Sequence, residues 1–189
     1  MSTTEITLIT LSSLILFFLV VPVLVKIISI LFKKTRYRQM GQSSQIRLIR
    51  QLNDAVENLA ATKTGAIITI LNKQDIDSLR TDGVKIDANI SSSLIIAIFN
   101  KKSPIHDGAI IIDNNKIIYA GTYYKITSKS VDNKYGARHR AALGISEQSD
   151  SLTIVVSEET GGVSFVINGS IHKIKLSDFQ EKLIKHLKS

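Results

Sequence analysis

The 189-residue chain contains no cysteine, two prolines and ten glycines, and only 6% of its residues are aromatic. The absence of cysteine excludes a disulfide framework, a thiolate zinc site, an iron–sulfur cluster and a cysteine nucleophile. So few glycines and prolines exclude a collagen-like or low-complexity chain. Hydrophobic residues make up 44% of the sequence, more than a fully disordered chain contains. The length is that of one ordinary domain with at most a short appendage.

Positive charge is concentrated in one short stretch of the chain. The formal net charge is +8, and residues 33–63 carry seven of the 24 Lys and Arg but only two of the 16 Asp and Glu. A nucleic-acid-binding domain would more often carry such an excess itself, so no nucleic-acid partner is expected. The distribution is more typical of a protein anchored beside a membrane surface.

The N-terminal region contains a long uncharged run. Residues 6–25 are 20 positions without a charge, and as a helix they would span roughly 30 Å, the hydrocarbon thickness of a bilayer. A secretory signal peptide or a buried core helix is the alternative. A signal peptide, however, needs positive charge before its apolar core, whereas here Glu5 precedes the run and four basic residues follow it between 33 and 38. Residues 1–38 are therefore predicted to be a transmembrane anchor with a basic juxtamembrane stretch.

The same charges predict the orientation of the chain. By the positive-inside rule, the N-terminus lies outside and everything after the basic stretch lies in the cytoplasm. The prediction is a single-pass protein of the cell membrane.

Residues 39–63 are predicted to form an amphipathic helix. Ile49, Leu52, Val56 and Leu59 recur at spacings of three and four residues, which places them on one helix face. More often such a stripe packs onto the chain's own domain. A short coiled coil between two chains is the alternative.

From Thr64 onward, strand and helix patterns alternate. Runs rich in β-branched residues predict strands at 65–71, 109–113, 116–121, 151–157 and 162–168. Helices are predicted at 90–99, 137–148 and 177–188. Interspersed strands and helices predict an α/β (α+β) fold over residues 64–189, with a central mixed β-sheet flanked by helices, preceded by one N-terminal transmembrane helix.

The first candidate site is the segment Pro104–Ala109 (PIHDGA), directly before an apolar strand. Asp-Gly is the commonest hairpin signal, so a plain turn is one interpretation. His106 beside Asp107 favours another, because imidazole and carboxylate together suit a divalent metal ion or accept a proton from a hydroxyl. Gly108 would let a ligand approach the backbone closely.

The second candidate site is the helix start at residues 136–140 (GARHR). Cations at a helix N-terminus are unfavourable for the helix, so two arginines and a histidine in the first turn need an explanation. A bound polyphosphate supplies one, because backbone donors, two guanidinium groups and an imidazole would surround it. The alternative is a solvated basic turn.

The third candidate site is the segment Ser157–Gly162 (SEETGG), which joins two predicted strands. Its two adjacent carboxylates could bind a metal ion or a ribose, or the hairpin could simply be solvated. None of the three segments contains a Walker A loop, a G-x-G-x-x-G fingerprint or an H-E-x-x-H helix.

The order HDGA, GARHRAALGISEQSD and SEETGG closely resembles the diadenylate cyclase (DAC) domain family, whose signature motifs are DGA and RHR. The likeness covers roughly residues 64–175. GAIITI and ANISSSLIIAIFNKKSPIHDGA also resemble that family's opening strand and the helix leading into DGA. A membrane helix before a short cyclase domain resembles the membrane-anchored CdaA-like group. That group usually has three spans, so this chain resembles its single-span CdaM type.

The resemblance implies that two ATP molecules condense into cyclic di-AMP and two pyrophosphates, with Mn²⁺, Mg²⁺ or Co²⁺ as the divalent metal. It also implies a homodimer in which two domains meet face to face and each 3′-hydroxyl attacks the other ATP's α-phosphate. The alternative is a non-catalytic membrane regulator that binds ATP or a cyclic dinucleotide. A structural membrane adaptor is a third hypothesis, and the sequence leaves room for a membrane or cytosolic regulator as a further partner.

The resemblance assigns roles to individual residues. Asp107 would polarise the attacking hydroxyl or bind the metal, and the RHR residues would hold the phosphates. The implied catalytic residues are Asp107, Arg138, His139 and Arg140. The implied ATP-binding residues are Gly108, Ala109, Tyr123, Ala137, Ser157 and Glu158. The implied metal ligands are Asp107, His106, His139 and Glu158.

Ala137 departs from the family pattern, which usually has threonine before RHR. The departure removes a hydroxyl from the implied phosphate site, and one neutral hydrogen bond is worth about 0.5–1.5 kcal/mol. Weaker nucleotide binding without loss of turnover is expected, because charges dominate phosphoryl-transfer sites.

Overall fold

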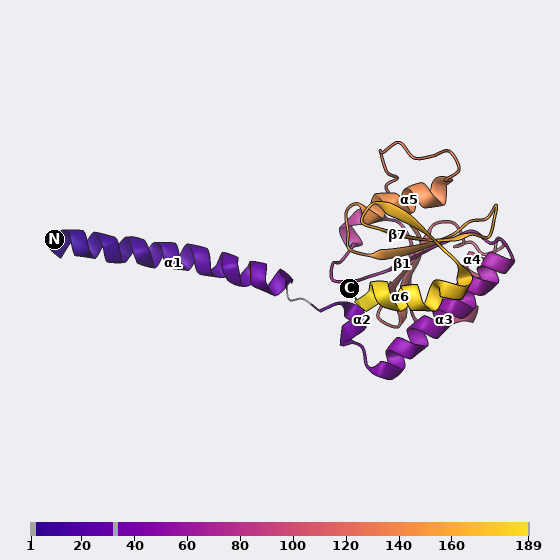
Figure 1. Ribbon diagram of the computed structural model, residues 1–189, viewed down its shortest axis with the longest axis horizontal. Coiled ribbons are helices and arrows are strands. Elements are labelled where there is room, and N and C mark those ends of the chain that lie inside the picture. The colour runs from indigo at the N-terminus through magenta and orange to yellow at the C-terminus, as the bar shows by residue number, and fades with distance from the viewer. Residues whose placement is uncertain (1–2, 32–33, 189) are drawn as a thin grey trace. The chain divides into compact units, whose positions relative to one another are not determined.

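The structure is a computed structural model that describes residues 3–31 and 34–188 (Figure 1). The chain divides into two compact units, Met1–Lys34 and Thr35–Ser189. The described residues of the first unit form one helix, α1 (Thr3–Leu31), with Pro22 inside it. Over the part of the chain whose side chains are described, no helix is found with the length and apolarity needed to cross a membrane. The predicted membrane span at 6–25 therefore stays a prediction.

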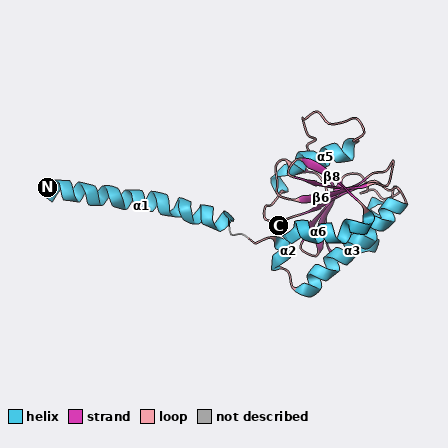
Figure 2. Ribbon diagram, viewed as in Figure 1, coloured by secondary structure: helices cyan, strands magenta, loops and turns pink. Residues whose placement is uncertain are grey.

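The second unit is built on one eight-stranded sheet with helices on both faces (Figure 2). The strands are β1 (Ala66–Ile70), β2 (Arg80–Thr81), β3 (Val84–Asn89), β4 (Ala109–Asp113), β5 (Lys116–Tyr124), β6 (Leu152–Val156), β7 (Val163–Ile167) and β8 (Ser170–Ile174). The helices are α2 (Arg36–Gln39), α3 (Gln42–Ala61), α4 (Ser92–Phe99), α5 (Ala137–Ser146) and α6 (Phe179–Lys188), with short 3₁₀ turns η1 (Asp77–Leu79) and η2 (Leu176–Asp178).

The sheet is mixed, as the sequence predicts. Its strand order is β2-β5-β4-β1-β6-β7-β8, with β3 also paired to β5. Only β1 and β4 run parallel, and the other described pairs are antiparallel. The sequence does not predict β3 or β8, because both are largely exposed and lack the apolar run of a buried strand.

The helices divide between the two faces of the sheet (Figure 1). On one face, α3, α4 and α6 bury a large apolar core against the central strands. That core includes Leu52, Val56, Ile68, Ile95, Ile110, Ile154 and Phe179. On the other face, α5 packs over smaller clusters, one of which contains Ile67, Ile111 and Ile145.

The stripe on α3 packs onto the chain's own domain. Ile49, Leu52, Val56 and Leu59 are all buried in the core shared with the sheet and α6. Burial of these four apolar side chains is worth several kcal/mol in total, at about 1.5–3 kcal/mol each. The compact unit therefore includes α2 and α3 together with the sheet.

Candidate active site

Four strands bring the candidate residues to the same end of the sheet. The register pairs Ile67 of β1 with Ala109 of β4, and Ala109 with Thr122 of β5. On the other side of β1, Ala66 pairs with Val156 of β6. The residues that flank these pairs therefore lie side by side, and they define what we call the site end of the sheet. They are Tyr123, Asp107, Gly65 and Ser157, in the order of their strands.

The first candidate segment is held tightly against β5. Gly108 has a φ of +103°, and a Cβ at this position would lie 2.7 Å from the carbonyl oxygen of Thr122. Only glycine fits both the left-handed backbone and the close approach. The exposed carboxylate of Asp107 accepts hydrogen bonds from the Gly108 N–H (3.1 Å) and the Tyr123 hydroxyl (3.3 Å). The charge of Asp107 raises the pKa of Tyr123, with burial a smaller cause, so this hydroxyl stays a donor.

Arg138 lies over the start of β1. Its Nη1 forms an ion pair with Oε2 of Glu158 at 2.8 Å. Its guanidinium group also rests on Gly65, where an added Cβ would lie 2.7 Å from the Arg138 Cζ atom. Gly65 therefore makes room for the arginine. This role of Gly65 was not predicted, although a glycine directly before the first apolar strand is visible in the sequence.

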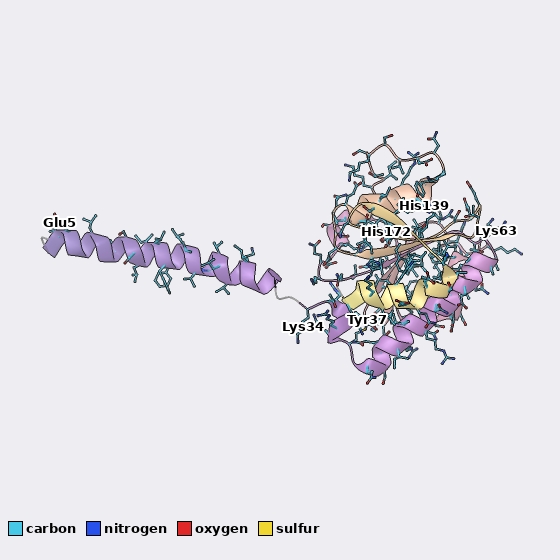
Figure 3. All side chains as sticks on the ribbon, viewed as in Figure 1. Glu5, Lys34, Tyr37, Lys63, His139 and His172 are labelled. Atoms are coloured by element: carbon cyan, nitrogen blue, oxygen red, sulfur yellow. The ribbon has the colours of Figure 1, made fainter. Side chains whose placement is uncertain are left out.

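His139 is buried and neutral rather than a cation facing solvent. It is 8% exposed, and its ring lies 5.1 Å from the Tyr135 ring between centroids. Burial lowers its pKa, and the nearby charge of Lys173 lowers it further, against the opposing effect of Glu159. A neutral imidazole can accept a hydrogen bond or ligate a metal ion, but it adds no positive charge for a phosphate. Figure 3 shows His139 on the α5 side of the sheet, away from α3 and α6.

Arg140 points away from Arg138. Residues two apart on a helix do not face the same direction, so both side chains cannot reach one ligand in the same way. The Arg140 Nε instead donates to the carbonyl oxygen of Tyr135 at 3.3 Å, and the Arg140 carbonyl accepts from the Thr127 N–H. In this structure Arg140 holds the loop before α5 against the helix through its hydrogen bond to Tyr135.

Two neighbouring hollows lie beside the start of α5. The smaller, of about 80 Å³, is lined by Lys134, Gly136, Ala137, Arg138, His139, Val156, Ser157, Glu158 and Glu159. The larger, of about 320 Å³, shares Lys134, His139, Ser157 and Glu159 and adds Lys173 among others. Asp107 and Tyr123 line neither hollow and reach the same end of the sheet through the strand register. Glu159 is the second carboxylate of the third candidate segment, whereas Lys134 and Lys173 were not among the predicted site residues.

The predicted metal ligands do not form a closed cage. Within residues 3–31 and 34–188, no group of three or more His, Asp or Glu side chains is placed to hold a metal ion. His106 Nδ1 donates to the Ser103 carbonyl oxygen at 2.6 Å, which leaves its Nε2 as an acceptor. The carboxylates of Asp107 and Glu158 are exposed at the site end. Mg²⁺-type sites often use one or two carboxylates and take the remaining ligands from substrate phosphates, and this donor set suits that arrangement.

The backbone of Gly108 and Ala109, at the end of the first candidate segment, lies at the start of β4. Ala109 is fully buried, so its contribution to a ligand site is limited to its backbone. The structure therefore brings together two sets of predicted residues at one end of the sheet. Asp107, Gly108 and Tyr123 form one set, and Ala137, Arg138, His139, Ser157 and Glu158 form the other.

A basic helix start above a mixed sheet, with carboxylates at the same end, defines a nucleotide-binding class of α/β domain. Residues 53–171 match the DAC family, described as DisA bacterial checkpoint controller nucleotide-binding. The chain belongs to this diadenylate cyclase domain family, which confirms the resemblance drawn from the motifs.

Several characterised proteins are similar to this chain. It is 39% identical over 155 residues to the diadenylate cyclase of Listeria monocytogenes, which covers 81% of this chain and 57% of that protein. It is 41% identical over 133 residues to the cyclic di-AMP synthase CdaA of Bacillus subtilis, covering 70% and 49%. It is 34% identical over 154 residues to the diadenylate cyclase of Mycoplasma pneumoniae, covering 80% and 76%. The chain thus spans about half the length of the first two proteins.

Two solved structures share the fold. DacA from Staphylococcus aureus, solved as a double mutant, superposes with a TM-score of 0.74 at 36% identity, covering 78% of this chain and 100% of that chain. A hypothetical membrane spanning protein from Bacillus cereus superposes with a TM-score of 0.66 at 38% identity, covering 67% and 62%.

Proposed function

We propose that this protein is a diadenylate cyclase that condenses two ATP molecules into cyclic di-AMP and two pyrophosphates. The observation that carries the proposal is the site end of the sheet, where Asp107 precedes β4 and Arg138 of α5 lies over the start of the neighbouring β1. The carboxylate precedes β4, and the guanidinium lies on Gly65, which precedes the neighbouring β1. Similar chains named diadenylate cyclase support the same activity.

The proposed chemistry is a double phosphoryl transfer. The 3′-hydroxyl oxygen of one ATP forms a bond to the α-phosphorus of the other, and the bond between that phosphorus and the bridging oxygen to the β-phosphate breaks. Pyrophosphate leaves with the electron pair, and the hydroxyl proton passes to the Asp107 carboxylate and then to water. A second, equivalent transfer closes the ring. Such reactions depend mainly on positioning and on neutralising charge.

Arg138 is the group proposed to hold the phosphates. Its guanidinium has five N–H donors in a fixed plane, and Glu158 uses Nη1. The remaining donors suit phosphate oxygens, which planar guanidinium groups bind in a bidentate way. The exposed Lys173 would add positive charge along the larger hollow, and Lys134, which is paired with Asp132, also lines it. Neutral His139 would contribute a hydrogen bond or a metal contact.

Asp107 and Glu158 are the carboxylates proposed to hold a divalent metal ion, with the Nε2 of His106 or a nitrogen of His139 as an additional ligand. When bound, Mn²⁺, Mg²⁺ or Co²⁺ would neutralise charge on the phosphates. Ser157, which lines both hollows, is proposed to contact a phosphate, and Tyr123 to stack on adenine.

The reaction needs two ATP molecules, and one chain offers one site end. We propose that two chains meet with these ends facing, so that each supplies one ATP. We also propose that residues 6–25 anchor the protein in the cell membrane as a single span, with the N-terminus outside and the folded unit in the cytoplasm. The uncharged run and the exposed, described hydrophobic side chains of α1 support the anchor.

The activity is tested with the purified unit Thr35–Ser189, which retains α3 and its core contacts, incubated with ATP and Mn²⁺. Cyclic di-AMP measured by chromatography should accumulate. Asp107→Asn should lower the rate about 10²–10⁴-fold, the usual contribution of a positioned proton acceptor. The exposed Asp54→Asn on α3 is the matched control and should keep full activity.

Two other outcomes would reject the enzyme. ATP that binds to the unit but is never converted would support the regulator that binds nucleotide without turnover. A unit that neither binds nor converts ATP would favour a structural membrane adaptor.

A further inference from the structure

The folded unit carries a basic surface that is assembled from distant parts of the sequence. Thr35, at the start of the unit, is buried and donates through its hydroxyl to the carbonyl oxygen of Leu187, 152 residues later, at 3.1 Å. Tyr37 in α2 is buried in the same core as Leu187 in α6. The first residues of the unit are therefore fixed against the last turn of its C-terminal helix.

This junction gathers positive charge. Arg38 on α2 and Lys185 and Lys188 on the last turn of α6 are exposed. Within residues 183–188 of α6 there is no acidic residue. The acidic Asp113 that lies near α2 is already paired with Arg36. Among the described residues, Arg38, Lys185 and Lys188 take part in none of the ion pairs of the unit.

The start of α3 adds an apolar side chain to the same region. The Gln45 side chain donates to the carbonyl oxygens of Tyr37 (2.8 Å) and Met40 (3.1 Å), which fixes α3 against α2. One residue later, Ile46 is 60% exposed. Arg50 lies one helical turn further on the same side and is also exposed. We call Arg38, Ile46, Arg50, Lys185 and Lys188 the basic face.

We propose that the basic face binds the headgroups of anionic phospholipids, so that the folded unit itself contacts the membrane surface. Cations beside an exposed apolar side chain are the combination that peripheral proteins use at an anionic interface. This inference concerns the unit Thr35–Ser189 and does not depend on whether residues 6–25 span the membrane.

The fold places the basic face opposite the site end of the sheet. The C-terminal end of α3 leads into β1 at the site end, whereas its N-terminal end lies 20 residues, roughly 30 Å, earlier. Independently, Arg36 pairs with Asp113 at the end of β4, and Asp107 lies just before the start of that strand. A unit bound through the basic face would therefore turn Asp107 and Arg138 away from the lipid, where ATP and a second chain can reach them.

The test uses the unit Thr35–Ser189, which has its own core and resembles a solved chain that matches over its full length. Co-sedimentation with phosphatidylcholine vesicles is compared with and without phosphatidylglycerol. The unit should bind only the anionic vesicles, and high salt should release it, because exposed charges are screened. Each neutralised cation should weaken binding about fivefold, the ratio that corresponds to about 1 kcal/mol per charge near an anionic surface.

The variant Arg38→Gln, Lys185→Gln, Lys188→Gln should therefore bind anionic vesicles about a hundredfold more weakly. The matched control is Lys85→Gln, Lys101→Gln, Lys102→Gln, which removes the same charge from exposed positions elsewhere. Ile46→Ser is a second variant that leaves the charge unchanged, and it should weaken binding severalfold. Circular dichroism checks that each variant is folded.

Three results would overturn the proposal. The first is equal binding to vesicles with and without phosphatidylglycerol. The second is an equal loss of affinity for anionic vesicles in the two triple variants. The third is binding to a DNA duplex as tight as binding to the anionic vesicles. Loss of cyclase activity with intact vesicle binding would reject the proposed function alone. Intact cyclase activity without vesicle binding would reject only this inference.

Discussion

At the scale of single residues, the site depends on the space that Gly65 leaves for Arg138. The guanidinium group occupies the place where a Cβ would stand, 2.7 Å from its Cζ atom. A larger residue at position 65 must push the guanidinium away from the start of β1 and from Glu158. The glycine is needed for this close approach rather than for an unusual backbone conformation.

Gly65→Ala is therefore expected to separate activity from stability. Misplacing the guanidinium should lower the rate of cyclic di-AMP formation about tenfold to a hundredfold. The free energy of unfolding should change by less than about 1 kcal/mol, because the displaced group is the end of a flexible side chain. Gly41→Ala, where a Cβ meets open space, is the control for both measurements. Unchanged turnover in Gly65→Ala would show that Arg138 does not hold the phosphates from this position.

Ala137 is the second residue whose side chain decides a property of the site. It lines the smaller hollow with Arg138 and Ser157, and its methyl group cannot donate a hydrogen bond. Ala137→Thr should restore a hydroxyl and lower the Kd for ATP about twofold to tenfold, which corresponds to one hydrogen bond of about 0.5–1.5 kcal/mol. Ala137→Val adds the same bulk without the hydroxyl and should not tighten binding. Calorimetry measures the Kd for ATP. Equal affinities of the Thr and Val variants would contradict the assignment of position 137 to the phosphate site.

At the scale of elements, α5 carries Arg138 and lies very close to the end of β5. A Cβ on Gly144 would fall well inside contact distance of the Lys125 carbonyl oxygen, which belongs to the backbone and cannot swing aside. Glycine at this position lets the helix approach the sheet far enough for its first turn to reach Gly65. Gly144 thus sets the distance between α5 and the sheet, and that distance allows Arg138, in the first turn of the helix, to reach Gly65.

Gly144→Ala is expected to destabilise the unit by about 1–3 kcal/mol, the usual cost of overpacking a close contact. Urea unfolding followed by circular dichroism measures this change. Activity should also fall, since lifting α5 moves Arg138. Gly136→Ala, at the helix N-cap with no atom within 4 Å of the new Cβ, should cost clearly less. Equal stability of the two variants would contradict the close approach.

At the scale of the whole molecule, the buried His139 and the half-buried His186 link stability to pH. Burial is the main cause that lowers the pKa of His139 and of His186, and neighbouring positive groups lower both further. In the unfolded chain a histidine titrates near pH 6.5. Below that pH the unfolded state binds more protons than the folded state, so acidification favours unfolding.

The free energy of unfolding should therefore be constant above about pH 7 and fall as the pH drops from about 6.5 toward the lowered native pKa values. Denaturant midpoints at pH 7.5 and pH 5.5 measure the difference. His139→Gln should reduce the pH dependence, and the double variant with His186→Gln should reduce it further. A wild-type midpoint that does not change across this interval would contradict the lowered pKa values of the two histidines.

Local sequence patterns determined most of the elements and the family. Runs rich in β-branched residues predicted β1, β4, β6 and β7, which are buried along almost their whole length. The 3.6-residue spacing of apolar residues predicted α3, and residue composition predicted α5. The exposed strands β3 and β8 were not predicted, because their residues follow no apolar pattern. These strands form by pairing with the free edges of β5 and β7. The motifs HDGA and GARHR marked the candidate segments by residue type alone.

Only the tertiary structure decided which of those residues share a site and what surrounds them. Strand order placed Gly65 between Asp107 and Ser157, and the direction of side chains on α5 sent Arg138 to Glu158 and Arg140 to the Tyr135 carbonyl. The joining of Thr35 to Leu187 likewise depends on how α2 and α6 cover the same sheet face. Spacing along the chain fixes local geometry, whereas these contacts join residues far apart in sequence and form only when both sheet faces bury their apolar side chains.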